Sequence, residues 1–306
     1  MNRSPIYFIN IAFLKLFSFL VFLISLNSLA QNEKAVYYYG AFQEGAIVRL
    51  FSDKVNILSE PSISADSIFS LSAGAPLVIV NETDGSYKQN GVVANWYEVI
   101  YTEGSNEKSG FVWGGSLSLS SIEITGTNGS KGDIFIYGIT AYDTLKNNFI
   151  SEARIIRNNS LLSAVCFDAI YTAFVTNGEY GYTVESELMG CRDFKNTCNI
   201  IKITFTYEAC AYTNGDVLLF WNGKELIYGA EAIDVSDAGA FSFKSEFVFP
   251  DETEKNDLLQ KGEKNKLIII ETNLTLDSDN NITESKINKR IFKWTGTRLV
   301  EKRKKN

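Results

Sequence analysis

Short runs of β-branched and aromatic residues recur along most of the chain and are separated by clusters of Gly, Asn, Ser and Asp. Such runs are typical of β-strands, and the clusters between them are typical of turns. In one run Lys202, Thr204 and Thr206 alternate with apolar or aromatic residues, which indicates a strand with one face in solvent. Helical spacing is nearly absent, and within the charged segment 251–266 we expect at most a short helix at 255–260. The pattern therefore predicts an all-β protein.

The expected strands follow one another at short intervals. Two lie near the N-terminus and six within residues 132–306. They are expected at 35–39, 47–51, 134–139, 153–156, 200–207, 217–221, 241–249 and 267–271. The pair Asn222–Gly223 is the preferred sequence of a two-residue turn and predicts a β-hairpin. The segment Phe220–Ile227 around it is similar to Lys293–Val300, since both have an aromatic residue, a Gly-containing turn and a strand. Two copies are too few for a propeller.

Residues 1–30 have the pattern of a secretory signal peptide. Arg3 and Lys15 carry positive charge, residues 16–26 are apolar, and Ser28-Leu29-Ala30 places small residues before Gln31. The alternative is an uncleaved membrane anchor, but the uncharged apolar run is shorter than the roughly 20 residues that a spanning helix needs. No Cys follows the run, so a lipoprotein attachment is not expected. We expect an exported protein, periplasmic or extracellular, without a stable membrane anchor after cleavage.

Composition and charge narrow the functional classes. The chain has 306 residues, of which 45 % are hydrophobic, so it can bury one large core or two ordinary ones. Its net charge of −7 gives no general attraction to phosphate backbones, so we expect no nucleic-acid partner. There is no histidine, which excludes Ser-His-Asp and Cys-His catalysis as well as zinc sites that need imidazole. Carboxylate chemistry remains open, because 36 Asp and Glu are present.

The stretch 46–119 carries the most specific motifs. It contains Val55–Ser62, a Gly-Ala-Pro turn before Leu77–Val80, the segment Asn95–Val99, and Gly110–Leu117. Together these motifs resemble the bacterial SH3-like (SH3b) domain, which is found in many secreted and cell-envelope proteins. The resemblance covers about a quarter of the chain and implies a small barrel of short strands. In two places the chain differs from the family: Leu58 stands where the family usually has Arg, and the hairpin after Val99 is longer.

Changes in composition suggest the domain organisation. Residues 31–45 form a lead-in with strand composition, and the SH3b-like stretch follows at 46–119. Residues 120–131 are polar and contain Gly, which predicts a linker. A β-rich domain extends over 132–300, and 301–306 form a basic tail. We therefore expect an all-β fold, with an N-terminal SH3-like small barrel followed by a larger, sandwich-like antiparallel β domain.

Four aromatic residues are candidates for a ligand groove at the barrel mouth, namely Tyr87, Trp96, Tyr97 and Trp113. Trp96 and Tyr97 point to opposite faces of one strand, so we expect only one of them fully in the core. The alternative interpretation of Trp96 and Trp113 is that both are core residues. By resemblance to the family, the expected ligand is peptidoglycan or a protein of the cell surface.

The four cysteines all lie in the C-terminal half. Their even number in an exported protein suggests disulfides, and four cysteines allow three pairings. Cys191 and Cys198 flank a short polar loop, so that pair closes a small loop, and Cys166 and Cys210 would then pair. A metal site is not expected, because there is neither a Cys-x-x-Cys motif nor a histidine.

Acidic residues suggest two further kinds of site. Asp234 and Asp237, with Glu246 or Glu208, supply candidate pairs for glycoside cleavage, which needs two carboxyl groups on opposite sides of the bond, although no spacing selects one pair. Residues 277–281 resemble part of a calcium loop but lack its Gly, and a hairpin tip is the better interpretation. We expect no metal and no cofactor.

Three functional hypotheses result. The first is a non-catalytic, exported binding module of the bacterial cell envelope. The second is a carboxylate-based, glycoside-type hydrolase in the C-terminal β domain. The third is a purely structural envelope component, for which exposed apolar edges would be expected.

Overall fold

The computed structural model describes residues 42–125, 132–146, 148–169, 183–207, 209–237, 239–252, 261–277, 279 and 281–302. The chain divides into two compact units, Met1–Ala35 and Val36–Asn306, and all described residues belong to the second. These residues form eighteen β-strands and one 3-10 turn, so the all-β prediction is confirmed. None of their helical segments is long and apolar enough to span a bilayer. The expected signal peptide, the strand at 35–39 and the short helix at 255–260 lie outside the described residues.

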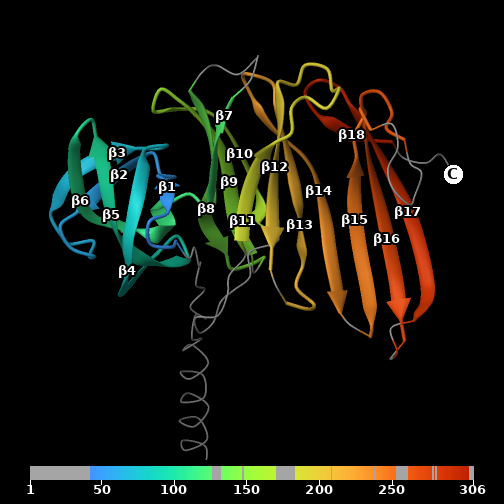
Figure 1. Cartoon of the computed structure of the whole chain (residues 1–306), viewed down its shortest axis with the longest axis horizontal. Coiled ribbons are helices and arrows are strands. Elements are labelled where there is room, and N and C mark those ends of the chain that lie inside the picture. Colours follow the sequence, from blue (N-terminus) through green and yellow to red (C-terminus); the bar gives the residue numbers. More distant parts are fainter. Residues whose placement is uncertain are drawn as a thin grey trace, which may run out of the picture. The chain divides into compact units, whose positions relative to one another are not determined.

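The first six strands form the N-terminal sheet (Figure 1). They are β1 (Ile47–Arg49), β2 (Lys54–Leu58), β3 (Ser67–Ser72), β4 (Pro76–Gln89), β5 (Val92–Glu103) and β6 (Asn106–Trp113), in the order β1-β4-β5-β6-β2-β3. A single 3-10 turn, η1 (Gly114–Ser116), follows β6. Leu50, Ile57 and Leu77 from different parts of this sheet meet in one cluster with Tyr97 and Val112, so the sheet curls around a core of its own.

Four strands form the middle sheet. They are β7 (Ser120–Ile124), β8 (Asp133–Asp143), β9 (Asn148–Arg157) and β10 (Ser160–Ala169), in the order β10-β9-β8-β7. Side chains on the two faces of β8 and β9 are buried in different clusters. Phe135 and Ile155 pack toward the C-terminal strands, whereas Ile136 and Ile156 pack against Phe51 of the N-terminal part. Strands β8 and β9 therefore bury apolar side chains on both faces, as expected of strands covered on both sides.

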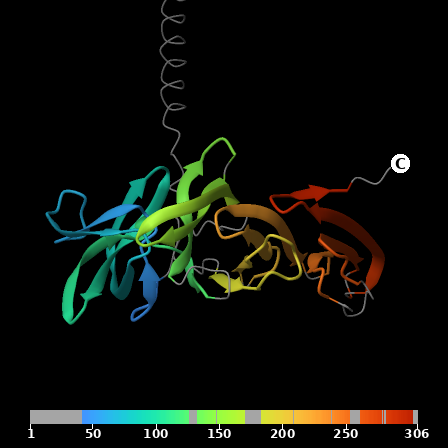
Figure 2. The same cartoon turned by 90° about the horizontal axis from the view of Figure 1, so that it is seen from above.

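The remaining strands form the C-terminal sheet, which is an antiparallel meander. It consists of β11 (Thr183–Leu188), β12 (Asn199–Thr206), β13 (Asn214–Trp221), β14 (Leu226–Asp237), β15 (Phe241–Val248), β16 (Lys266–Leu276), β17 (Ile282–Trp294) and β18 (Leu299–Glu301). Ile201 and Trp221 pack onto the middle sheet, and Phe220 and Trp294 lie in a second core on the opposite face. Figure 2 shows that this sheet is bent.

The expected linker is in part a strand. Ser120–Ile124 pairs with β8, with Ser121 opposite Ile136 and Ile124 opposite Asp133, and Ile124 is buried. Its polar composition suggested a loop, but apolar residues alternate with polar ones, and Ile122 and Ile124 face the core. The remaining expected linker residues, 126–131, are outside the described part of the chain. The residues on either side of 120–124 share two hydrophobic clusters, so the fold is continuous across this segment.

The hairpin predicted at Asn222–Gly223 is confirmed. It joins β13 to β14, and the Asn222 side-chain oxygen accepts hydrogen bonds from the backbone N–H groups of Lys224 (2.9 Å) and Glu225 (2.8 Å). Gly223 has a φ of 92°, which a side chain would disfavour. The similar segment Lys293–Val300 also forms a hairpin, between β17 and β18.

The disulfide prediction is wrong, because all four cysteines are free. Cys166 lies on β10 of the middle sheet, whereas Cys210 follows β12 of the C-terminal sheet. Cys191 is exposed, and Cys198 instead packs against the core beside Gly223. The loop between them is held by Phe194, which inserts into the second core of the C-terminal sheet. Partial burial raises the pKa of both the Cys166 and the Cys198 thiol, which disfavours the reactive thiolate.

Candidate functional site

A groove runs along β2 of the N-terminal sheet. This strand pairs with β3 over its whole length but with β6 only at Leu58, opposite Phe111. The chain closes again where the Phe51 N–H donates to the Ser116 carbonyl oxygen at 2.8 Å. A cavity of about 550 Å³ is lined by residues of β2, β4, β5, β6, η1 and the middle sheet, and we call it the aromatic groove. Its opening follows from the single point of pairing between β2 and β6.

One wall of the aromatic groove contains three of the four predicted ligand residues, Tyr87, Trp96 and Trp113. The Tyr87 ring lies 5.8 Å from Trp113, edge to face, and 6.3 Å from Trp96. The Trp113 indole N–H donates to the carbonyl oxygens of Tyr87 (3.0 Å) and Ala94 (3.1 Å), which fixes the plane of its ring. A side chain at position 115 would collide with the same ring. Glycine there therefore leaves the space that the Trp113 indole occupies. Contacts within the chain thus set the orientation of the Trp113 ring.

The structure does not place Tyr97 in the groove lining. Its side chain is 2 % exposed, lies in the core of the N-terminal sheet and donates a hydrogen bond from its hydroxyl to Glu82 (3.1 Å). Trp96 is also buried, at 5 % exposure, so the expectation that only one of the pair is fully buried is wrong. The two rings do face opposite sides of β5. The outer side is covered as well, because Tyr87 on the long strand β4 packs near Trp96.

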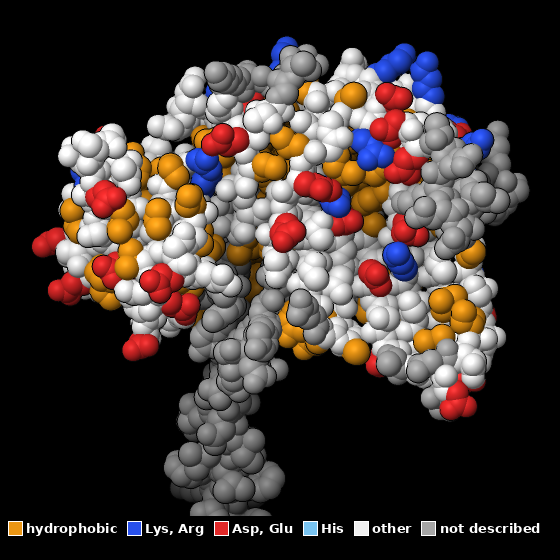
Figure 3. Space-filling view, viewed as in Figure 1, with side chains coloured by type: hydrophobic (Ala, Val, Ile, Leu, Met, Phe, Trp, Pro, Cys, Tyr) orange, Lys and Arg blue, Asp and Glu red, His pale blue; other side chains and the backbone are white. Residues whose placement is uncertain are grey.

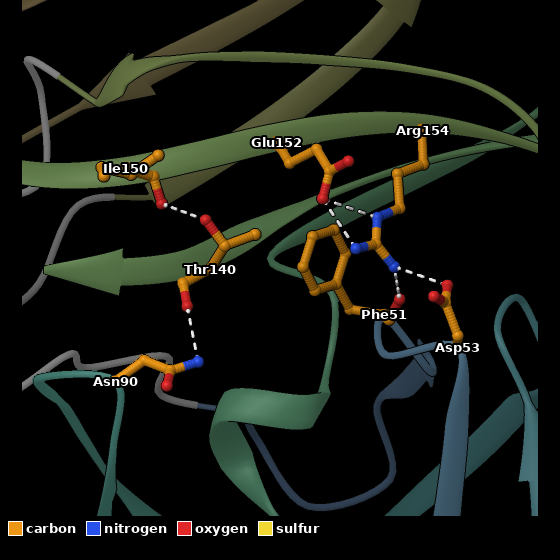
Figure 4. A network of polar contacts seen from close by, with 7 residues as sticks. All are labelled: Phe51, Asp53, Asn90, Thr140, Ile150, Glu152 and Arg154. Atoms are coloured by element: carbon orange, nitrogen blue, oxygen red, sulfur yellow. Dashed lines mark hydrogen bonds and ion pairs between the residues drawn. The ribbon is translucent and has the colours of Figure 1, made fainter.

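The opposite wall is polar and is built around Arg154 of β9 (Figure 4). Its guanidinium lies over the Phe51 ring, 4.3 Å from the ring centre, and donates to the Phe51 carbonyl oxygen at 2.8 Å. Nε and Nη2 both donate to Glu152, at 2.9 and 2.6 Å, and Nη1 forms an ion pair with Asp53 at 3.0 Å. The side chain of Arg154 is only 12 % exposed. This arginine therefore joins β9 to the segment before β2.

A tight turn closes the end of the groove. Asn90 and Gly91 both have positive φ angles, 51° and 78°, as the two central residues of a type I′ hairpin turn do. The Asn90 amide donates to the carbonyl oxygen of Thr140 on β8 (3.4 Å), and the Thr140 hydroxyl donates to the Ile150 carbonyl oxygen (3.1 Å). Figure 4 shows this chain of contacts on the side of the groove that Arg154 also lines. The turn thereby positions the end of β4 that carries Tyr87.

Sequence reasoning found the aromatic wall but missed the polar one. Arg154 stands in β9 two residues after Glu152, and its other partners, Phe51 and Asp53, are about a hundred residues away in the chain. One signal for the polar wall was Arg154 itself. A charged side chain in a strand that is covered on both faces needs a polar partner. The Asn-Gly pair at 90–91 was a second signal, for the hairpin that reaches the middle sheet.

A second cavity, of about 340 Å³, lies on the C-terminal sheet where β14 and β15 separate. Asp234 and Glu246 line it, whereas Asp237 does not, and Glu208 is outside the described residues. Glu246 forms an ion pair with Lys244 at 3.5 Å. Glu252 lies in the same lining and pairs with Arg192 at 2.9 Å. Candidate acids of the hydrolase hypothesis are thus brought together, in a lining that also contains cations.

The described residues Asp277, Asp279 and Asn281 lie at the tip of the hairpin between β16 and β17, as expected. One carboxylate oxygen of Asp277 accepts hydrogen bonds from the backbone N–H groups of Asp279 (2.9 Å) and Asn281 (2.8 Å). These bonds lower the pKa of Asp277, those from Asn281 most strongly. Its carboxylate therefore has a structural role in closing the turn. Within the described residues no three Cys, Asp or Glu side chains are grouped to hold a metal ion.

Exposed large hydrophobic side chains are spread over the three sheets. They include Ile47 (73 % exposed) on β1, Leu145 (96 %) after β8 and Ile282 (59 %) on β17. On the face in Figure 3 hydrophobic, acidic and basic side chains are interspersed. Such scattered residues are normal for a protein surface and do not by themselves mark an assembly interface.

Comparison with family models, with curated proteins and with solved structures gave no match. A functional argument for this chain therefore rests on its own residues and on the geometry of the aromatic groove.

Proposed function

We propose that the protein is a non-catalytic, exported binding module of the cell envelope, and that its aromatic groove holds a strand of peptidoglycan. The observation that carries the proposal is the groove itself, open, about 550 Å³ in volume, with an aromatic wall and a hydrogen-bonding wall facing it. Sugar rings stack on aromatic faces, and peptide stems need polar partners. Ligand sites generally combine apolar surface with a few placed polar groups.

The resemblance to SH3b domains supports the same ligand class. We infer that residues 46–119 form the SH3b-like barrel, because their strands curl around one core and the groove opens beside it. Leu58, which stands where the family usually has Arg, is the residue that closes β2 onto β6. The arginine of this groove is instead Arg154, outside the SH3b-like stretch.

The groove favours binding over catalysis. Among its described lining residues Asp53 is the one carboxylate, and glycoside cleavage needs two. The chain also has no histidine to activate a nucleophile. A groove with a single exposed acid is suited to holding a polymer.

Co-sedimentation with insoluble purified peptidoglycan tests this proposal. The chain from Gln31 onward is compared with Trp113→Ala and Tyr87→Ala, and with Tyr212→Ala, an exposed tyrosine between β12 and β13, as the control. We expect wild type and the control to sediment with the wall material and both groove variants to stay in solution. Circular dichroism shows whether the variants are folded, and Tyr87→Ala keeps the test valid if Trp113→Ala is not. Wild type remaining in solution contradicts wall binding and turns the search to surface proteins and to a structural role.

The second candidate is a carboxylate-based hydrolase in the C-terminal sheet. It is favoured by one observation, that Asp234 and Glu246 line the same cavity. Lys244, which forms an ion pair with Glu246, lies in the same lining, so the two acids do not form an isolated carboxylate pair. Release of new reducing ends from peptidoglycan by wild type, and its loss in Asp234→Asn, would establish the hydrolase; we expect no release.

A further inference from the structure

We infer that the aromatic groove binds a carboxylate group of its ligand at Arg154, in the place that Asp53 takes in the free protein. The inference rests on the proposed function and names the chemistry that the groove recognises. It concerns a part of the site that the SH3b resemblance does not cover, because Arg154 belongs to the middle sheet.

The guanidinium of Arg154 is held ready for such a group. One face stacks on Phe51, and the edge formed by Nε and Nη2 is bound to Glu152, whose side chain is only 13 % exposed. Nη1 also donates to the Phe51 carbonyl oxygen. These contacts already restrict the Arg154 side chain. Binding of a ligand to its guanidinium would therefore cost little side-chain entropy of the protein. Arginine presents its N–H groups in a planar fork that fits a carboxylate.

The contact of Arg154 with Asp53 is much more exposed to solvent than its contact with Glu152. It is a single ion pair of 3.0 Å, and the Asp53 side chain is 71 % exposed. Ion pairs of this exposure contribute little to stability, because solvent screens them. A ligand carboxylate that replaces Asp53 would keep Nη1 of Arg154 bound to a carboxylate oxygen and would bring the remaining atoms of the ligand into the groove. Asp53 therefore acts as a competitor for the position.

The rest of the groove fits a chain attached to that carboxylate. Lys54, the next residue, is exposed and lines the groove, so a second cation is close to the same end. Gln89 and Asn90 offer amides, and Trp113 offers an apolar face. The ligand class is a peptide or peptidoglycan stem with a free carboxylate. Two sources share this chemistry, the C-terminal carboxylate and the carboxylate of a glutamate within the chain.

The test uses a synthetic peptidoglycan stem pentapeptide in three forms, with both carboxylates free, with the C-terminus amidated, and with the glutamate amidated. Binding is measured by isothermal titration calorimetry. We expect one amidated form to bind about tenfold more weakly than the free acid, and that form identifies the source. Arg154→Gln should lower the affinity for the free acid to that of the amide. Lys244→Gln, on the C-terminal sheet, is the control and should change nothing.

Asp53→Asn is the decisive variant, because it removes a solvent-exposed acid and should not disturb folding. If Asp53 competes with the ligand, this variant binds the free acid several-fold more tightly and binds the weaker amide as wild type does. Equal affinities of wild type for all three peptides, or weaker binding by Asp53→Asn, would overturn the inference. Sedimentation on whole peptidoglycan without binding of any peptide also overturns it, while the proposed function stands. Loss of sedimentation as well means that the proposed function itself fails.

Discussion

Replacing Phe51 by Ala should destabilise the N-terminal and middle sheets together. The Phe51 side chain is 3 % exposed and packs with Ala73, Ile136 and Ile156, which come from both sheets. Its ring also lies against Gly138, where a side chain would approach it within 2.7 Å. The ring therefore fills the space between the two sheets. Without it, the neighbouring side chains would leave a cavity there.

The expected loss follows from this geometry. Phe→Ala substitutions in well-packed cores cost about 3–5 kcal/mol, the larger values occurring where the surroundings cannot collapse. The stacking of Arg154 on the ring adds about 1 kcal/mol, since this arginine is largely buried. We therefore expect the free energy of unfolding to fall by about 4–6 kcal/mol, a large part of the 5–15 kcal/mol typical of a folded protein. Phe241→Ala, at a residue that is 38 % exposed, should cost less than about 1 kcal/mol.

Urea denaturation followed by tryptophan fluorescence measures this loss. Trp96 and Trp113 report on the N-terminal sheet, and Trp221 and Trp294 report on the C-terminal sheet. Because the sheets share hydrophobic clusters, all four probes should move together. A loss below about 1 kcal/mol would refute the packing argument. Two separate transitions, only the first of which shifts in Phe51→Ala, would show that residues up to 119 fold as an independent domain.

Three further predictions concern single sites. Gly115→Ala should lower both the thermal midpoint and peptidoglycan binding, because a Cβ there would lie 2.3 Å from the indole ring packed against it. Arg157→Gln should lower the free energy of unfolding in urea by about 3–5 kcal/mol, because it leaves the fully buried Asp133 carboxylate without its cation at 2.6 Å. Lys266→Met should lower the thermal midpoint more at pH 7 than near pH 3, since the hydrogen bond from Lys266 lowers the pKa of Glu263 below its ordinary value, and the resulting stabilisation is lost as the pH falls toward and through that lowered pKa. An equal effect of Lys266→Met at both pH values would contradict this assignment.

Alternation of residue types predicted the strands well but not what covers them. The alternation around Lys202 and Thr204 predicted one solvated face. In β12 this polar face is half-buried, and Ile200 on it lies in the second core. The same rule placed Trp96 and Tyr97 on opposite faces of β5. It gave no information about the outer face, where the long β4–β5 hairpin brings Tyr87 over Trp96. Burial there depends on a tertiary contact that local periodicity does not contain.

The segment before the middle sheet and the polar wall were harder to predict for two separate reasons. Ser120–Ile124 has only two large apolar residues among polar ones, and its pairing with β8 outweighs its loop-like composition. Arg154 has no motif around it, and its role depends on Phe51 and Asp53, which the fold brings to it from another sheet. Contacts between residues so distant in sequence come from topology rather than from spacing.

Hydrogen–deuterium exchange of the full chain with and without soluble peptidoglycan fragments tests the central claim most directly. The aromatic groove predicts slower exchange at 53–58, 87–92 and 113–116, and little change around the cavity that Asp234 and Glu246 line. Protection confined to that second cavity, or no protection anywhere, would contradict the account.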